Sequence, residues 1–179
     1  DRVTGMVGFQ IPAQASVATV LLTPESSRLL VVSSLEDIGD GPGDLGDPVA
    51  YADPVTGAEG EITITEIADP FEEYPEGSDP QPDTRYVLVT VTVENTGTEP
   101  IDIGPSSFVL HDAAGYLWTY AFVPRESDVT VPDLQSQQLA PGSRVSGVVG
   151  FVLSEDTDLA GVVLQPEFSR IIPLYMVES

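Results

Sequence analysis

Residues 85–95 read RYVLVTVTVEN, and this stretch decides the fold class of the chain. A valine stands at every second position from Val87 to Val93, and the positions between hold Leu, Thr, Thr and Glu. Successive side chains of a β-strand point to opposite sides, so this alternation predicts a long strand with one face in a core. Asn95-Thr96-Gly97 has the residue types of a turn and predicts a tight connection to the next element.

Shorter segments of strand character occur on both sides of this stretch, separated by turns that contain Gly or Pro. No segment of ten or more residues combines helical periodicity with a cap and a stop signal. Residues 69–85 and 124–142 are polar and predict long loops. We therefore predict an all-β fold, an antiparallel immunoglobulin-like β-sandwich. The other predicted strands are 2–11, 17–22, 28–33, 60–68, 101–103, 108–111, 116–120, 144–153, 162–164 and 170–176.

The two ends of the chain repeat each other. Residues 1–37 align without a gap to residues 143–179, with 14 identities over the 37 positions, and the shared Arg, Gly, Pro and Glu do not follow from strand composition. The repeat predicts three segments: 1–36 as the C-terminal strands of a first, truncated immunoglobulin-like domain, 37–57 as an acidic linker, and 58–179 as a complete domain. An unpaired set of strands needs a partner, so we expect pairing with another chain, as in a homo-oligomer, or with a fragment of its own first domain.

The predicted linker carries four aspartates, Asp37, Asp40, Asp44 and Asp47, in a segment rich in glycine. Calcium takes about six to eight oxygen ligands, and carboxylates on a flexible loop supply several of them. The spacing of the four residues does not match the EF-hand pattern. Two interpretations stay open: a joint stiffened by calcium, or a solvated spacer whose charges repel one another. No other cofactor is predicted.

Three motifs of the complete domain carry a family resemblance. They are RYVLVTVTVENTGTEPIDI (85–103), FVLHDAAGYLW (108–118) and LAPGSRVSGVVGFVLSED (139–156). In these motifs the chain resembles the bacterial surface family catalogued as domain of unknown function 4352, and the first 36 residues share the last motif. The resemblance implies an immunoglobulin-like sandwich in exported, often lipid-anchored proteins, without enzymatic activity and without ligand residues to carry over. The chain departs from the family in its lack of lysine and its acidity.

The loop over 69–85 is acidic and carries two aromatic residues. Its partner-binding candidates are Phe71, Glu72, Glu73 and Tyr74, because loops on a rigid sandwich often carry the binding function. A recognition loop for a basic partner and a solvated excursion both stay open.

Two further groups of residues, His111 with Asp112 and the aromatic residues at 116, 118 and 120, are interpreted as structural. His111 stands beside Asp112, but no serine lies in the context of a nucleophile, so we interpret His111 as a partly exposed hairpin residue. Tyr116, Trp118 and Tyr120 share one face of a predicted strand and form either a core seam or an exposed aromatic ledge.

The composition excludes several classes of function. Acidic residues number 29 against six arginines and no lysine, and a net charge of −23 repels nucleic acids and anionic lipids, so we expect no nucleic-acid partner and no membrane insertion. We expect a non-enzymatic, exported bacterial surface protein, extracellular or tethered upstream of this chain, that serves as a binding or spacer module for an unknown partner. One alternative is an assembly protein whose N-terminal strands complement a neighbouring subunit. The other is an accessory module of a cell-wall or sugar-polymer hydrolase.

Overall fold

The computed structural model describes residues 4, 6, 8, 10, 19–25, 28–34, 44–126, 129–167 and 170–177. Within these ranges no α-helix occurs, and no helix is long and apolar enough to cross a membrane. The strands are β1 (Thr19–Glu25), β2 (Arg28–Ser34), β3 (Pro48–Ala52), β4 (Glu59–Ala68), β5 (Thr84–Asn95), β6 (Ile101–Ile103), β7 (Phe108–Asp112), β8 (Leu117–Thr119), β9 (Gln137–Leu139), β10 (Arg144–Ser154), β11 (Leu159–Glu167) and β12 (Arg170–Met176), with a 3₁₀ turn at Pro105–Ser107.

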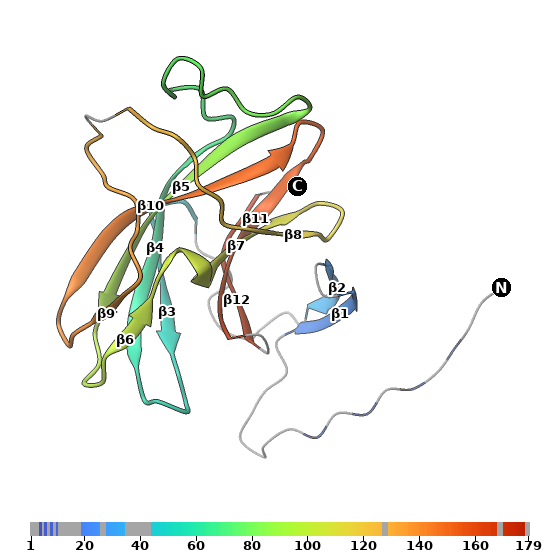
Figure 1. Cartoon of the computed structure of the whole chain (residues 1–179). Helices are drawn as coiled ribbons and strands as arrows, with labels where there is room; N and C mark the ends of the chain where they lie inside the picture. Colours follow the sequence, from blue (N-terminus) through green and yellow to red (C-terminus); the bar gives the residue numbers. More distant parts are fainter. Residues whose placement is uncertain are drawn as a thin grey trace.

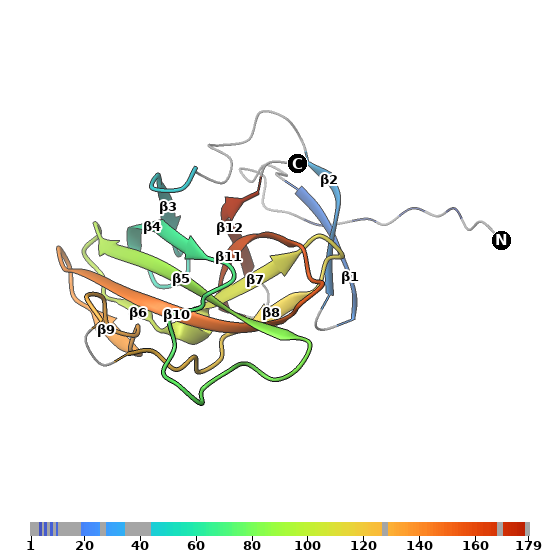
Figure 2. The ribbon, with the colours of Figure 1, turned by 90° about the horizontal axis from the view of Figure 1, so that it is seen from above.

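Two four-stranded sheets pack against each other (Figure 1). The first has the strand order β10-β5-β4-β3, the second has the order β12-β11-β7-β8, and β6 pairs with β9 in a small third sheet. Every pair of neighbouring strands is antiparallel. Figure 2 shows the same two sheets from above. The predicted all-β, antiparallel sandwich is therefore confirmed.

The core lies between the two large sheets. The valines of β5, from Val87 to Val93 at every second position, are all 0% exposed and form the inner face of the first sheet. Phe108 of β7 and Val162 of β11 are also fully buried and belong to the same apolar cluster from the opposite sheet. The alternation that predicts the strand therefore predicts its buried face as well.

Asn95, at the end of β5, is a buried polar residue that joins three segments. Its side-chain nitrogen donates to the carbonyls of Glu99 and Leu139, both at 2.9 Å, and its side-chain oxygen accepts from the amide of Gly97 at 3.0 Å. The Asn95 backbone amide also donates to the carbonyl of Ser143 at 2.9 Å. The predicted turn is thus fixed by a buried side chain as well as by its glycine.

The predicted linker over 37–57 extends too far. Residues 48–52 form β3, an edge strand of the first sheet, and the amide of Gly46 already donates to the carbonyl of Ile64. The following turn is held by Asp53, whose carboxylate accepts from the Val55 amide at 2.8 Å. The sequence hides β3 because five residues with two alanines and a proline carry little strand character.

Two other predicted segments correspond only in part to the structure. Strand β9 lies inside the segment 124–142, which the sequence predicts as irregular throughout. The predicted strand 2–11 lies mostly outside the described residues. The predicted strands 17–22 and 28–33 correspond to β1 and β2, whose hairpin forms a sheet of its own, drawn in blue beside the sandwich in Figure 1.

Candidate functional site: an acidic groove on the first sheet

The outer face of the first sheet is partly apolar. On this face Tyr86 and Leu88 of β5 and Val148 of β10 are 9%, 8% and 5% exposed, although they point away from the main core. They are buried because two loops cross this face: a first loop, residues 69–83, between β4 and β5, and a second loop, residues 120–136, between β8 and β9. These loops add a small second core outside the sandwich.

Aromatic packing holds the first loop to the sheet. The amide of Phe71 donates to the carbonyl of Tyr86 at 2.8 Å. The ring of Tyr74 makes edge contacts with both neighbours, at centroid distances of 6.4 Å to Phe71 and 5.5 Å to Tyr86. Edge-to-face pairs at such distances are favourable, so these rings fix the start of the loop.

Arg85 fastens the first loop to the turn after β10. Its guanidinium donates to both carboxylate oxygens of Asp69, at 2.6 and 3.1 Å. The same group donates to the carbonyls of Ser154, Glu155 and Thr157 at 2.6 to 2.8 Å. The pKa of Arg85 is raised above its ordinary value, and the hydrogen bond to Asp69 is the largest cause. The residue therefore stays charged and joins Asp69 to a turn that lies 69 to 72 residues after Arg85 in the sequence.

The second loop is bonded to the free edge of β10. The amide of Ala121 donates to the carbonyl of Gly150 at 2.7 Å, and the amide of Leu134 donates to the carbonyl of Val148 at 2.9 Å. The Val148 amide in turn donates to the carbonyl of Pro132. Loop backbone thus satisfies the polar groups of an edge strand, which limits edge-to-edge association there.

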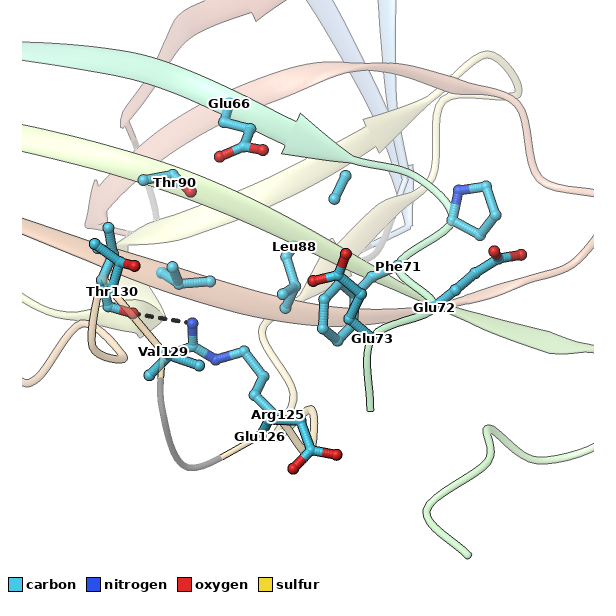
Figure 3. Close-up of a pocket in the computed structure, with 14 residues that line it drawn as sticks. Glu66, Phe71, Glu72, Glu73, Leu88, Thr90, Arg125, Glu126, Val129 and Thr130 are labelled. Atoms are coloured by element: carbon cyan, nitrogen blue, oxygen red, sulfur yellow. Dashed lines mark hydrogen bonds between the residues drawn. The ribbon is translucent and has the colours of Figure 1, made fainter. Parts of the chain in front are cut away.

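A groove of about 620 Å³ lies between the two loops (Figure 3). Apolar groups from Ala68, Leu88 and Val148 contribute to its floor, and Phe71 lines one side. In Figure 3, Glu66 and Glu126 lie on opposite sides of the apolar patch that Leu88 and Phe71 form. The groove therefore combines an apolar surface with charged groups at its margin.

The charged groups of the groove are mostly acidic. Glu66, Glu72, Glu73 and Glu126 line it, and all four are exposed. Among the described lining residues the one cation is Arg125, which donates to the carboxylate of Asp133 at 2.5 Å and to the carbonyl of Val131 at 3.0 Å. Because Asp133 neutralises Arg125, the carboxylates determine the sign of the local potential. The arrangement favours a ligand that is both cationic and partly apolar.

The structure brings three of the four partner-binding candidates to this groove. Phe71, Glu72 and Glu73 line it, whereas Tyr74 packs behind them against Tyr86. Apart from Pro70, the remaining lining residues come from β4, β5, β10 and the second loop, so no local sequence pattern groups them. One residue in the sequence does indicate a covered outer face: Leu88 is apolar, although it lies on the face of β5 that the alternation assigns to solvent.

The calcium candidates fall in two groups. Asp37 and Asp40 lie outside the described residues. Asp44 and Asp47 are exposed and belong to one turn, in which the Asp47 amide donates to the carbonyl of Asp44 at 2.9 Å. Among the described residues, no three acidic or histidine side chains are grouped so that they could hold a metal ion.

The pair His111 and Asp112 has a structural setting. His111 is 8% exposed, so its interpretation as a partly exposed residue is wrong; its strand β7 lies inside the second sheet, between β8 and β11. The Asp112 carboxylate accepts from the Tyr116 amide at 2.7 Å and from the Trp118 indole nitrogen at 2.9 Å. Asp112 therefore shapes the β7–β8 hairpin.

The three aromatic residues around β8 divide between the two predicted settings. Trp118 packs against the main core, whereas Tyr116 and Tyr120 are 39% and 48% exposed.

With this geometry defined, comparison with known proteins identifies the family. Residues 50–170 match the family described as domain of unknown function DUF4352, and the chain belongs to this family. The solved structure of MPT63, a secreted protein from Mycobacterium tuberculosis, is similar to this chain with a TM-score of 0.50 and a sequence identity of 15%. The alignment covers 69% of this chain and 88% of MPT63. The solved structure of the yjhA protein from Bacillus subtilis matches this chain with a TM-score of 0.49 and a sequence identity of 20%. That alignment covers 69% of this chain and 80% of yjhA. Curated proteins give no match.

Proposed function

We propose that this chain is an exported, non-enzymatic binding module whose acidic groove receives a basic, partly apolar segment of a protein partner. The proposal rests on one observation: the groove places an apolar floor beside four exposed glutamates, while Arg125 is neutralised by Asp133. Apolar contact would supply affinity, and the carboxylates would select the charge of the ligand and speed the encounter.

Two observations support the export and the absence of catalysis. The family is defined by its domain and not by a reaction, and MPT63, which has a similar fold, is a secreted protein. Among the described residues that line the groove there is no serine, histidine or cysteine. The described part of the groove therefore offers apolar and acidic groups for recognition.

The test is the affinity for a fluorescent peptide of alternating arginine and leucine. The groove variant combines Glu66→Gln, Glu73→Gln and Glu126→Gln, and a matched control combines Glu61→Gln and Asp102→Asn with Glu99→Gln. All six side chains are exposed, and only the first three line the groove, so both variants lose the same net charge.

At an ionic strength of about 50 mM, three lost charge pairs of about 0.5 kcal/mol each predict a roughly ten-fold weaker affinity for the groove variant. The matched control should change the affinity less than about two-fold, because its charges act only at long range. Equal weakening in the two variants would contradict the proposal, because it would mean that the peptide responds to the overall charge alone.

A further inference from the structure

The side of the groove that the first loop forms combines an aromatic ring with a carboxylate. Phe71 and Glu73 both line the groove, and they belong to the same short segment of the loop. In Figure 3, the carboxylate of Glu73 points toward Leu88 on the floor of the groove, whereas the carboxylate of Glu72 points away from it. A ligand on this part of the floor therefore meets both the ring and a negative charge.

The ring of Phe71 is held from behind. Its backbone amide donates to the carbonyl of Tyr86 at 2.8 Å, and the ring makes an edge contact with Tyr74 at a centroid distance of 6.4 Å. The Phe71 side chain packs against the small second core but is only half-buried, so part of its surface is open to the groove. A ring that is already fixed needs little further ordering when a ligand stacks on it.

The carboxylate of Glu73 is available to a ligand. It is exposed, and the ion pairs between described side chains use three other acids, Asp69, Glu94 and Asp133. Arg125, on the opposite side of the groove, is bound to Asp133, and its side chain is only 11% exposed. A cation that approaches Glu73 therefore meets a charge that no described side chain pairs with.

A ring beside an available carboxylate suits the guanidinium of an arginine better than the ammonium of a lysine. A guanidinium is planar and weakly hydrated, so it stacks on an aromatic face while its N–H groups bind a carboxylate through two parallel bonds. Within this chain, Arg85 binds both oxygens of Asp69 in this way, at 2.6 and 3.1 Å. An ammonium is compact and strongly hydrated, so it gains the attraction of the carboxylate and little from the ring.

We propose that the groove selects arginine over lysine in the partner segment, with Phe71 stacking on the guanidinium and Glu73 accepting its N–H groups. This inference rests on the proposed function, because it names the residue that anchors the same ligand. Glu66 and Glu126, at the margins of the groove, attract either cation and do not distinguish between them. Phe71 and Glu73 are therefore the residues that determine the specificity.

The test compares the arginine–leucine peptide with a peptide in which every arginine is replaced by lysine, both bound to the full chain at an ionic strength of about 50 mM. The arginine peptide should bind about five-fold more tightly. Phe71→Leu keeps an apolar side chain but removes the ring, and it should reduce this ratio of affinities to less than about two-fold. Glu73→Gln should reduce the ratio to about half, because it removes the charged acceptor of the two bonds.

Glu126→Gln is the matched control, since it removes one charge from the groove and leaves the ring and Glu73 in place. It should weaken both peptides by a similar factor and leave the ratio unchanged. The Glu73→Gln variant also separates specificity from folding, because Glu73 is an exposed loop residue outside the described ion pairs.

Two results would overturn the inference. One is an equal affinity of the unaltered chain for the two peptides, and the other is an unchanged ratio in both Phe71→Leu and Glu73→Gln. Failure of the proposed function gives a different result, in which the triple glutamate variant and its matched control weaken the arginine peptide equally. If the triple variant weakens both peptides selectively but the ratio is one, the groove binds basic segments without selecting arginine.

Discussion

Replacing Asn95 with alanine should destabilise the sandwich strongly without touching its apolar core. The Asn95 side chain is 1% exposed and makes three hydrogen bonds, to Glu99, Leu139 and Gly97. Alanine would leave the buried carbonyl of Leu139 without this donor, at a cost of about 1–3 kcal/mol, and would remove two further bonds worth about 0.5–1 kcal/mol each. We expect a total loss of about 3 kcal/mol in the free energy of unfolding.

Urea denaturation and thermal melting measure this loss. For a chain of this size, about 3 kcal/mol corresponds to a fall of roughly 10 °C in melting temperature. Thr96→Ala is the matched control, since Thr96 is the exposed neighbour in the same turn and should change stability by less than about 0.5 kcal/mol.

The variant Asn95→Asp tests the same reasoning from another side. It keeps the oxygen that accepts from Gly97 but replaces the donor with a charged acceptor facing the carbonyls of Glu99 and Leu139. At neutral pH it should be at least as destabilising as alanine. Wild-type stability in either Asn95 variant would refute the account of this turn.

Three further predictions concern other parts of the chain. Arg85→Ala should lower the free energy of unfolding by about 2 kcal/mol, measured by urea denaturation. Because the raised pKa of Arg85 keeps it charged until strongly alkaline pH, this loss should be the same from about pH 6 to pH 9. A loss that changes within this range would contradict the prediction. Asp112→Ala removes the acceptor for the Tyr116 amide and the Trp118 indole, so the free energy of unfolding should fall by about 2 kcal/mol. The near-ultraviolet circular dichroism of Trp118 should also change. An unchanged spectrum would count against this role of Asp112. The melting temperature should be equal in EDTA and in millimolar calcium at fixed ionic strength, because Asp44 and Asp47 form a plain exposed turn; a rise specific to calcium would support the metal-stiffened joint instead.

The long strands could be predicted because the alternation of apolar and polar residues within each of them is visible without knowledge of its partner strand. In β5, alternating valines face one core, and no distant segment is needed to see this. Strand β3 could not be predicted in the same way, since Pro48–Ala52 becomes a strand only by pairing with β4. Local propensity is weak there, and the partner decides the conformation.

The groove could be predicted only in part. Phe71, Glu72 and Glu73 are evident as an acidic aromatic loop, but the other side comes from Arg125 and the residues after it, more than 50 positions away in the sequence. The sequence also gives no sign that Asp133 neutralises Arg125, which requires the second loop to fold back on itself. Sites assembled from separate loops depend on tertiary contacts that periodicity does not report.

The most direct test of the proposed binding site is to map where the arginine–leucine peptide binds, using amide chemical-shift changes in the full chain. The shifts should concentrate at Phe71, Leu88, Arg125 and Val148, the floor and sides of the groove. At the same peptide concentration they should be clearly smaller in the Glu66→Gln, Glu73→Gln, Glu126→Gln variant, whose affinity should be about ten-fold weaker. Small shifts spread over all acidic surfaces, unchanged by this variant, would contradict a defined groove site.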